Sequence, residues 1–453
     1  MSVGHVELAG WGRTAPTTAR WIELSAAALE SGAGRSAIAG AGRGTIARGL
    51  GRAYGDAAQN AGGTVVRLVP ADSEIDLDPV AGTARVGAGV GLDQLLRRIV
   101  PAGWFVPVTP GTRFVTVGGA LAADVHGKNH HADRSFGHHV ERFGIVLADG
   151  AHLSVTSSSH PDLWWATIGG MGLTGIITDV TFRLLPIETS SCRVATRRVP
   201  HLEALLELME EGDHSHRYSV AWIDLLATGS HLGRAVLQLG DHATERDLAE
   251  HGHTGDPLAF APSTLLTVPP LPNVMSRPAV RLFNEFWYRK APAHHVGLES
   301  LTRFFHPLDG VGAWNRLYGR AGFVQYQFVV PFEAVGVLRA VIERVSQARL
   351  PSAITVLKRM GERSGGLLSF PQPGWTLTFD VSAATPGLPA LLAELDRLVV
   401  AAGGRHYLAK DACTTPEMIR AGYPRLDEWK AIRRAVDPDG RWSSDLARRL
   451  DLL

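Results

Sequence analysis

Titratable side chains gather directly behind a glycine pair in the segment between residues 111 and 140. A short β-branched run at residues 114–117 stops at Gly118 and Gly119, and an alanine-rich stretch follows. This order predicts a strand, a tight glycine turn and a helix N-terminus, where free backbone N–H groups bind a phosphate or an electron-rich ring. The polar residues that end the stretch predict a cofactor wall with a catalytic edge: His126, Lys128, Asn129, His130 and His131.

A second glycine-rich segment, residues 48–56, follows a short predicted strand at residues 45–47. Its spacing does not match the dinucleotide fingerprint G-x-G-x-x-G, and it does not run cleanly into a helix. The glycines still allow the backbone to approach a pyrophosphate, and Arg48 and Arg52 carry charge to neutralise it. A plain surface turn is the alternative, but the alternation of arginine and glycine favours a phosphate-binding loop.

Further polar side chains that could meet a substrate lie in the second half of the chain. Residues 323–330 alternate, so Gln325 and Gln327 lie on one face of a predicted strand, where they contact either substrate or water. Trp222 alone is more typical of a core aromatic residue. Lys410, near a predicted strand end, is alone more typical of a solvated lysine.

The histidines between residues 126 and 139 are the candidates for a metal centre. No carboxylate or cysteine completes a familiar ligand spacing there. The two cysteines, Cys192 and Cys413, lie far apart in the sequence. We therefore expect no metal site, no disulfide framework and two free thiols.

Composition indicates a folded, soluble protein of about two domains. A chain of 453 residues is too long for one ordinary core, and 45% hydrophobic with 20% charged residues is typical of a globular protein. Lysine and arginine (45) balance aspartate and glutamate (44), so no nucleic acid partner is indicated. No signal peptide is visible, and no apolar run is long enough to span a membrane.

Short strands alternating with short helices predict an α+β domain up to about residue 186. It includes an alanine-rich helix over residues 20–40 and a hairpin that turns at residues 148–150. A second α+β domain with an antiparallel sheet follows. Within it, the prolines and apolar residues of the segment 258–289 predict a long irregular segment, which is either a mobile lid at a membrane surface or a disordered loop. The predicted domain limits are 1–189 for the first part of one domain, 190–404 for the second domain, and 405–453 for the return to the first.

Several motifs together resemble a known flavoprotein group. ARGLGRAYGDAAQN, VTVGGALAADVHGKNHH and GGMGLTGIITDVTF resemble the FAD-binding domain of the vanillyl-alcohol oxidase/para-cresol methylhydroxylase superfamily. WGRTAP, FWYRK, FFHPLDG, GFVQYQFVVP and YLAKD resemble the decaprenylphosphoryl-β-D-ribose 2′-oxidase family, and the resemblance covers nearly the whole chain. It implies a two-domain α+β flavoprotein in which FAD takes a hydride from C2 of a polyprenyl-phosphoryl ribose. It also implies an NADH-dependent reductase partner that reduces the keto sugar to the arabinose epimer used in cell walls.

The resemblance also implies roles for individual residues. Residues of three segments, together with Ile177 and Tyr407, would hold FAD: Ala47, Arg48, Gly49, Leu50, Gly51, Arg52, Ala53, Tyr54, Gly55, Asp56 and Ala57; Gly111, Thr116, Val117, Gly118 and Gly119; Ala123, Asp124, Val125 and His126. The residues near the isoalloxazine ring and substrate would be Tyr54, His126, Lys128, Trp222, Tyr318, Gln325, Gln327, Lys358, Thr378 and Lys410. Lys410 would hold the sugar or its developing alkoxide by charge, and either it or His126 would be the base.

Three positions depart from the family pattern. Arg52 stands where many superfamily oxidases carry a histidine bonded to the flavin, so non-covalent FAD is expected. Thr378 replaces a characteristic cysteine, which argues against thiol-directed covalent inhibition because a hydroxyl is a poorer nucleophile. Thr376 stands where an asparagine is common.

Two alternatives to the sugar-lipid oxidase stay open. One is an oxidase of a soluble alditol or aldonolactone that uses oxygen as acceptor. The other is a non-catalytic flavin-binding partner of a reductase. For the leading interpretation we expect a peripheral position at the cytoplasmic membrane in the cell envelope, with the side of the membrane undetermined.

Overall fold

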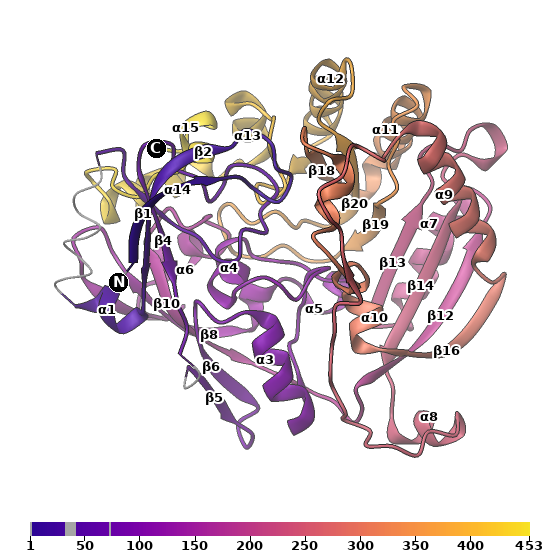
Figure 1. Ribbon diagram of the computed structural model, residues 1–453, viewed down its shortest axis with the longest axis horizontal. Helices are drawn as coiled ribbons and strands as arrows, with labels where there is room; N and C mark the ends of the chain where they lie inside the picture. Colours follow the sequence, from indigo (N-terminus) through magenta and orange to yellow (C-terminus); the bar gives the residue numbers. More distant parts are fainter. Residues whose placement is uncertain (1, 32–41, 72–73) are drawn as a thin grey trace.

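The computed structural model describes residues 2–31, 42–71 and 74–453, which form two halves, each built on sheets (Figure 1). The half at the left of Figure 1 begins with a four-stranded sheet in which β2, β4 and β3 are parallel and β1 pairs antiparallel with β2. Its strands are β1 (Ser2–Leu8), β2 (Thr17–Leu24), β3 (Thr45–Ala47) and β4 (Thr64–Leu68).

A five-stranded antiparallel sheet in the order β5-β6-β10-β8-β9 completes this half. Its apolar side chains, including Val86 and Val180, share a core with Leu121 and Trp164 from the helices that cover the sheet. The predicted hairpin at residues 148–150 is confirmed, because it joins two paired strands. The elements are β5 (Ile75–Asp78), β6 (Thr83–Gly87), α3 (Leu92–Ile99), α4 (Val117–Ala122), β8 (Val140–Val146), β9 (His152–Val155), α6 (Pro161–Thr167) and β10 (Ile176–Arg183).

The other half is one eight-stranded antiparallel sheet in the order β16-β12-β14-β13-β19-β20-β18-β21. Helices α7, α11 and α12 pack on one face, where alternate residues such as Tyr326, Phe328 and Leu377 form an apolar core. The strands are β12 (Ser191–Val199), β13 (Tyr218–Ile223), β14 (Ala235–His242), β16 (His294–Ser300), β18 (Phe323–Val330), β19 (Thr355–Met360), β20 (Gly374–Ser382) and β21 (Arg405–His406). The helices are α7 (Leu202–Asp213), α11 (Val335–Gln347) and α12 (Leu388–Ala401).

After β21 the chain returns to the first half, where its yellow helices lie beside the indigo N-terminal strands (Figure 1). Trp429 and Leu446 pack with Ile46 and Val65 in one core, and the Trp429 indole donates to the carbonyl of Ala166. These helices are α13 (Pro416–Gly422), α14 (Leu426–Val436) and α15 (Asp445–Arg449).

Short elements connect the two halves and decorate their edges. The helices are α1 (Ala26–Glu30), α5 (His130–Asp133), α8 (Glu245–Glu250), α9 (Arg277–Lys290) and α10 (Leu301–Phe305). The two-residue strands are β7 (Trp104–Phe105), β11 (Leu185–Pro186), β15 (Leu266–Thr267) and β17 (Val311–Gly312).

Three local predictions were wrong in whole or in part. Of the helix predicted over residues 20–40, residues 26–30 are helical (α1), but residues 20–24 form the end of β2, because pairing with both β1 and β4 overrides the alanine-rich context. Residues 32–40 of that prediction lie outside the described residues. No strand covers residues 114–117, since Thr116 is the N-cap of α4 and Gly118 and Gly119 lie inside its first turn. Residues 277–289 of the predicted excursion are helical.

Candidate active site

Four neighbouring strands of the eight-stranded sheet bring one row of side chains to the face turned away from α7, α11 and α12. Gln327 on β18 lies opposite Thr378 on β20. Thr378 in turn lies opposite Val356 on β19, and Val356 lies opposite Trp222 on β13. Because directly opposite residues of antiparallel strands share a face, the register itself assembles this row.

Two further rows continue the same face. Lys358 lies opposite Thr376, and Gln325 lies opposite Asp380. Each is two positions along its strand from the first row, so its side chain points the same way. The register therefore brings together residues for which substrate contact was predicted: Trp222, Gln325, Gln327, Lys358 and Thr378.

A hydrogen-bond chain joins this face to His126, which follows α4. The Thr376 hydroxyl donates to the carbonyl of Phe328 at 2.8 Å, so its oxygen accepts from the Gln327 amide at 3.0 Å. The Gln327 amide nitrogen also lies 3.0 Å from His126 Nε2, which therefore accepts. Burial, with a contribution from Lys358, holds the pKa of His126 well below its ordinary value, so the ring is neutral at pH 7 and carries its proton on Nδ1.

Lysines add positive charge to the same region. Burial, together with the smaller effects of the Lys410 and Lys128 charges, lowers the pKa of Lys358 to about 7. Burial also lowers the pKa of Lys128 to about 8; its ammonium donates to the carbonyl of Phe304 and lies 3.9 Å from that ring's centroid. All three lysines remain partly exposed.

Lys410 reaches this region from the turn after β21. Its ammonium lies 5.1 Å from the ring centroid of Tyr54, and it donates no hydrogen bond to another described residue. Tyr54 meets Phe323 edge-to-face at 5.6 Å, and the fully buried Tyr318 stacks on Phe323 at 4.3 Å. These contacts bring the glycine loop of residues 47–57 to the sheet.

Asp380 is a buried carboxyl group that sequence reasoning missed. Its Oδ1 accepts from the Gln325 amide, while its Oδ2 has no partner among the described residues. Burial raises the pKa of Asp380, and the nearby Lys410 ammonium opposes this rise. For Lys410 the signs are reversed: burial lowers its pKa, and the nearby Asp380 carboxylate opposes this decrease. The one signal in the sequence is a lone carboxylate in the otherwise uncharged stretch from Gly374 to Ser382.

Two glycines of the loop pack so closely against neighbouring residues that a side chain at either position would have no room. A Cβ on Gly49 would lie 2.4 Å from Oγ1 of Thr116, and a Cβ on Gly55 would lie 2.0 Å from the carbonyl oxygen of Asp411. The Arg449 guanidinium fixes the loop further by pairing with both oxygens of Asp56 at 2.7 and 2.8 Å.

The free backbone amides lie in this loop and not in the turn where the sequence placed them. Within the described residues, the amides of residues 49–53 donate no hydrogen bond. By contrast, Gly118 donates to the carbonyl of Ala88, and Gly119 donates to the Thr116 hydroxyl. The unpaired backbone amides that could bind an anionic group are therefore those of residues 49–53.

The two arginines of the glycine loop differ in how many of their hydrogen-bond donors remain available to a ligand. Arg48 donates to the carbonyls of Ala58 and Ala9, at 3.0 and 2.7 Å, and so braces the loop. The Arg52 guanidinium lies 3.8 Å from the centroid of a ring of Trp11, and its buried Nε has no partner in the described part of the chain. Arg52 thus retains hydrogen-bonding capacity for a ligand.

The remaining predicted cofactor residues surround His126 or lie near α4. The Tyr407 hydroxyl donates to the carbonyl of Ala123 at 2.9 Å, and its ring lies 5.2 Å from that of His126. The Asp124 carboxylate is occupied by Ser135, Ser369 and the amide of Gly137. Val125 and Ile177 are buried, whereas Gly111 is exposed.

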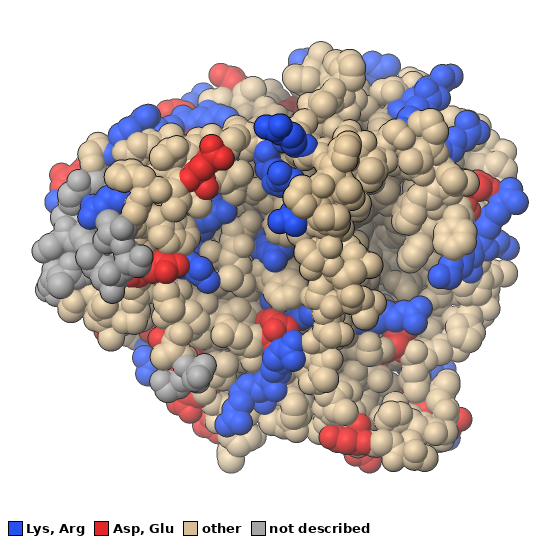
Figure 2. Space-filling model, in the orientation of Figure 1, with Lys and Arg blue, Asp and Glu red and all other residues tan. Residues whose placement is uncertain are grey.

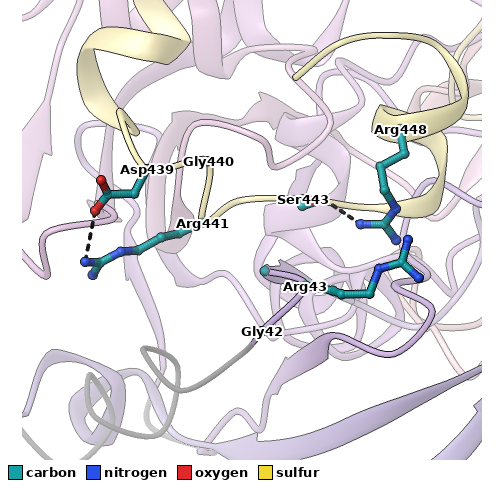
Figure 3. A pocket seen from close by; sticks show the side chains of 8 residues that line it. Gly42, Arg43, Asp439, Gly440, Arg441, Ser443 and Arg448 are labelled. Atoms are coloured by element: carbon teal, nitrogen blue, oxygen red, sulfur yellow. Dashed lines mark hydrogen bonds and ion pairs between the residues drawn. The ribbon is translucent and has the colours of Figure 1, made fainter.

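A separate surface pocket lies between residues 42–44 and 439–448 (Figure 3). Arg441 pairs there with Asp439, and Arg448 donates to Ser443, so these two guanidinium groups are already satisfied. Within the described ranges, no cluster of three or more histidine, cysteine or acidic residues is arranged to hold a metal ion.

Comparison with known proteins identifies the family. A family model described as FAD binding domain matches residues 36–156, and one described as D-arabinono-1,4-lactone oxidase matches residues 328–450. Decaprenylphosphoryl-β-D-ribose oxidase of Mycolicibacterium smegmatis is 44% identical over 450 residues, which cover 98% of this chain and 97% of that protein. The chain belongs to this family.

The decaprenylphosphoryl-β-D-ribose oxidase family and both family models fit the vanillyl-alcohol oxidase/para-cresol methylhydroxylase superfamily, so the predicted two-domain α+β fold is confirmed. FAD is therefore the cofactor, as predicted. Alditol oxidase of a Streptomyces species is more distant, at 23% identity over 401 residues and 86% of each chain.

The residues present fit FAD. The unpaired amides of residues 49–53 and the Arg52 side chain suit a pyrophosphate. The buried Nδ1 of His126 and Oε1 of Gln327, both without a partner among described residues, are a donor and an acceptor left for a polar ring system or a substrate.

Proposed function

We propose that the protein oxidises the C2 hydroxyl of a polyprenyl-phosphoryl ribose to the 2-keto sugar. The identity of 44% along nearly the whole chain to an oxidase of that name supports this reaction over the alternatives. The single structural observation that carries it is the cationic, partly open face at Lys358 and Lys410, which suits a substrate with a phosphate and a reacting hydroxyl.

FAD, when bound, supplies the hydride acceptor. We propose that the residues predicted to contact it hold it: residues 47–57 at the pyrophosphate, and His126, Tyr407 and the segments around α4 at the flavin. We also propose the domain limits 1–189, 190–404 and 405–453, noting that the two residues of β21 still pair with the second sheet. Because Arg52 occupies the position of the linking histidine, the cofactor is held without a covalent bond.

The proton of the substrate hydroxyl needs a base. His126 was one candidate, but its Nε2 lone pair already accepts from Gln327. Lys358 has a pKa of about 7, so about half of it is neutral and able to accept a proton at neutral pH. We assign the base to Lys358 and the stabilisation of the developing alkoxide to Lys410, whose charge Asp380 supports.

The remaining candidates position the sugar. The amides of Gln325 and Gln327, the Tyr54 and Tyr318 hydroxyls, the Thr378 hydroxyl and the Lys128 ammonium supply hydrogen bonds, and Trp222 supplies an apolar wall. The Trp222 indole N–H is occupied, because it donates to the carbonyl of Ala353 at 2.9 Å. Its ring face is the part left for a substrate.

The biological setting is part of the same proposal. The keto sugar passes to an NADH-dependent reductase, and the pair provides the arabinose donor for cell-wall arabinan. The protein works at the periphery of the cytoplasmic membrane, where its lipid substrate resides. Among the described residues no helix combines the length and apolarity that crossing a bilayer requires.

An anaerobic absorbance titration tests the reaction. The purified holoprotein is mixed with a short-chain polyprenyl-phosphoryl ribose while the oxidised flavin band is followed. Bleaching of the band, with a 2-keto sugar as product, supports the proposal. An alditol or aldonolactone that bleaches the flavin when the ribose lipid does not would establish the soluble-substrate alternative. Release of the flavin by acid precipitation tests its non-covalent attachment.

Replacing Lys410 with alanine separates a catalyst from a flavin-binding scaffold. We expect bleaching to slow by about 10² to 10⁴-fold, because a charge next to the developing alkoxide is lost. Flavin content should stay at the wild-type level, as measured by absorbance at equal protein concentration. A scaffold would show no substrate-dependent bleaching in either protein.

A further inference from the structure

Helix α9 turns most of its large apolar side chains outward, and its two buried residues are Val280 and Asn284. Asn284 is buried, whereas Leu282 and Phe286 are 73% and 59% exposed, and Phe283 and Trp287 are also exposed. These four apolar residues lie at i, i+1, i+4 and i+5, so they form one stripe on the helix. A surface helix of a globular protein normally turns such a stripe toward the core.

The inverted orientation is fixed by specific bonds. The Asn284 side-chain amide donates to the Asp224 carboxylate at 2.7 Å, directly beyond the end of β13. Arg234 bridges Asp224 and Glu285 at 2.7 and 2.6 Å, and it lies 4.6 Å from the Tyr288 ring centroid. The apolar stripe therefore faces outward because the inner side of α9 is tied to the sheet.

Positive charge borders the stripe. Arg277, Arg281, Arg289 and Lys290 are exposed on α9, and its one acidic residue, Glu285, is paired with both Arg234 and Arg289. In Figure 2 the surface at the right, over α9, is tan with blue side chains at its border. In the segment that leads into α9, Leu265 and Leu266 are also 84% and 56% exposed.

We infer that α9 docks the protein on an anionic lipid bilayer, with Leu282, Phe283, Phe286 and Trp287 inserted at the interface. Aromatic and leucine side chains flanked by arginine and lysine are the composition of a helix that lies in the plane of a membrane surface. Basic side chains near an anionic leaflet add attraction that falls as salt rises. An exposed apolar stripe of this size needs a partner, and the surrounding charge selects an anionic one.

The position of α9 connects this surface to the candidate active site. Arg198 lies opposite Val236, and Val236 lies opposite Trp222, so all three share the face that carries the site. Arg198 donates to the carbonyl of Arg289 in α9. Docking through α9 thus places the edge of that face at the bilayer. A lipid-linked substrate could then pass from the bilayer directly to the candidate active site; this route rests on the proposed function.

Vesicle sedimentation of the holoprotein tests the inference. We expect binding to phosphatidylglycerol-containing vesicles, weakened by high salt, and little binding to pure phosphatidylcholine. Phe286→Glu/Trp287→Glu should lower the vesicle-bound fraction at least about tenfold, because it puts two charges into the inserted stripe. Val80→Glu, at a 97% exposed apolar position in the other half, is the matched control and should bind like wild type.

Other results overturn the inference. Equal vesicle binding by wild type and Phe286→Glu/Trp287→Glu would exclude α9 as the docking element, and a reductase complex lost in that variant while vesicle binding persists would make α9 a protein interface. Flavin content and melting temperature equal to wild type show that the variant is folded. Vesicle binding is measured without substrate, so a protein that binds vesicles but is not bleached by the ribose lipid contradicts only the proposed function.

Discussion

At the level of single residues, the proton chemistry of this site follows from what each nitrogen already does. His126 Nε2 accepts from Gln327, whose amide is oriented in turn by Thr376. Lys358 has one weak contact, 3.4 Å to the carbonyl of Gly127, and its pKa is lowered to about 7. The lysine is therefore better suited than the histidine to take a proton near neutral pH.

The first prediction concerns the pH dependence of this lysine. A base acts in its deprotonated form, so kcat/KM should rise tenfold per pH unit below about 7 and level off above it. Lys358→Met should lose this limb and about 10² to 10⁴-fold in rate. Lys358→Arg keeps the charge but does not titrate in this range, so it should also lose the limb. A limb that survives in Lys358→Met but disappears in His126→Gln would return the role to His126.

A second residue prediction tests the pairing of Asp380 with Lys410. Asp380→Asn keeps the shape and the amide contact of Gln325 but removes the carboxylate that opposes the lowering of the Lys410 pKa. Lys410 should then lose its proton at a lower pH, so activity should decline on the alkaline side earlier than in wild type. Steady-state rates between pH 6 and 9 measure this, and identical alkaline limbs would show that the pair is not coupled.

Which of these residues the sequence reveals depends on how local the signal is. The alternation around Gln325 and Gln327 is visible within one strand, and the structure has both on one face. Asp380 lies on β20, a central strand whose residues are all buried, so no alternation of exposure singles it out. Its relation to Lys410 arises only when the sheet register and the turn after β21 are in place.

At the level of elements, the free amides predicted at Gly118 and Gly119 are absent, whereas the loop also predicted to bind phosphate has them. The loop of residues 47–57 keeps free amides, while the amides of Gly118 and Gly119 are used within the protein. Glycine motifs show where a backbone approach is allowed. Whether an amide is free depends on distant partners such as Ala88, which the local sequence does not indicate.

Replacing Gly49 with alanine tests the role of this loop. The new Cβ would lie 2.4 Å from Thr116 Oγ1, and that hydroxyl caps α4 through Gly119 at 3.1 Å, so it cannot move without losing the cap. We expect about 1 kcal/mol less stability and several-fold weaker FAD binding, measured by melting temperature and flavin fluorescence. Gly336→Ala is the control, since its Cβ meets nothing within 4 Å. Full FAD occupancy and an unchanged melting temperature in Gly49→Ala would contradict this role.

At the level of the whole molecule, burial keeps several histidines neutral. Burial lowers the pKa of His130 and His306 to about 3 and that of His242 to about 4. Below pH 6.5 the unfolded chain takes up protons at these residues and the folded protein does not. Stability is therefore lost as the pH falls from 6.5, by about 2 kcal/mol per such histidine at pH 5.

The corresponding prediction is a melting temperature that falls between pH 7 and pH 5 with FAD in excess. His306→Gln should melt lower at pH 7, because the contact of His306 with Thr109 at 2.8 Å is altered. It should nevertheless lose less between pH 7 and pH 5, since one proton-binding site of the unfolded chain is gone. An equal drop in both proteins would show that His306 does not contribute to the acid sensitivity.

The pairing of Arg449 with Asp56 joins residues that are 393 positions apart. The ribosome therefore completes the glycine loop long before it makes the guanidinium that fixes the loop, and α15 is the last described helix or strand to be made. Until then the glycine loop, for which we propose pyrophosphate binding, lacks one of its supports. The fully braced form of the loop therefore exists only once α15 has been made and has packed against the first half of the chain.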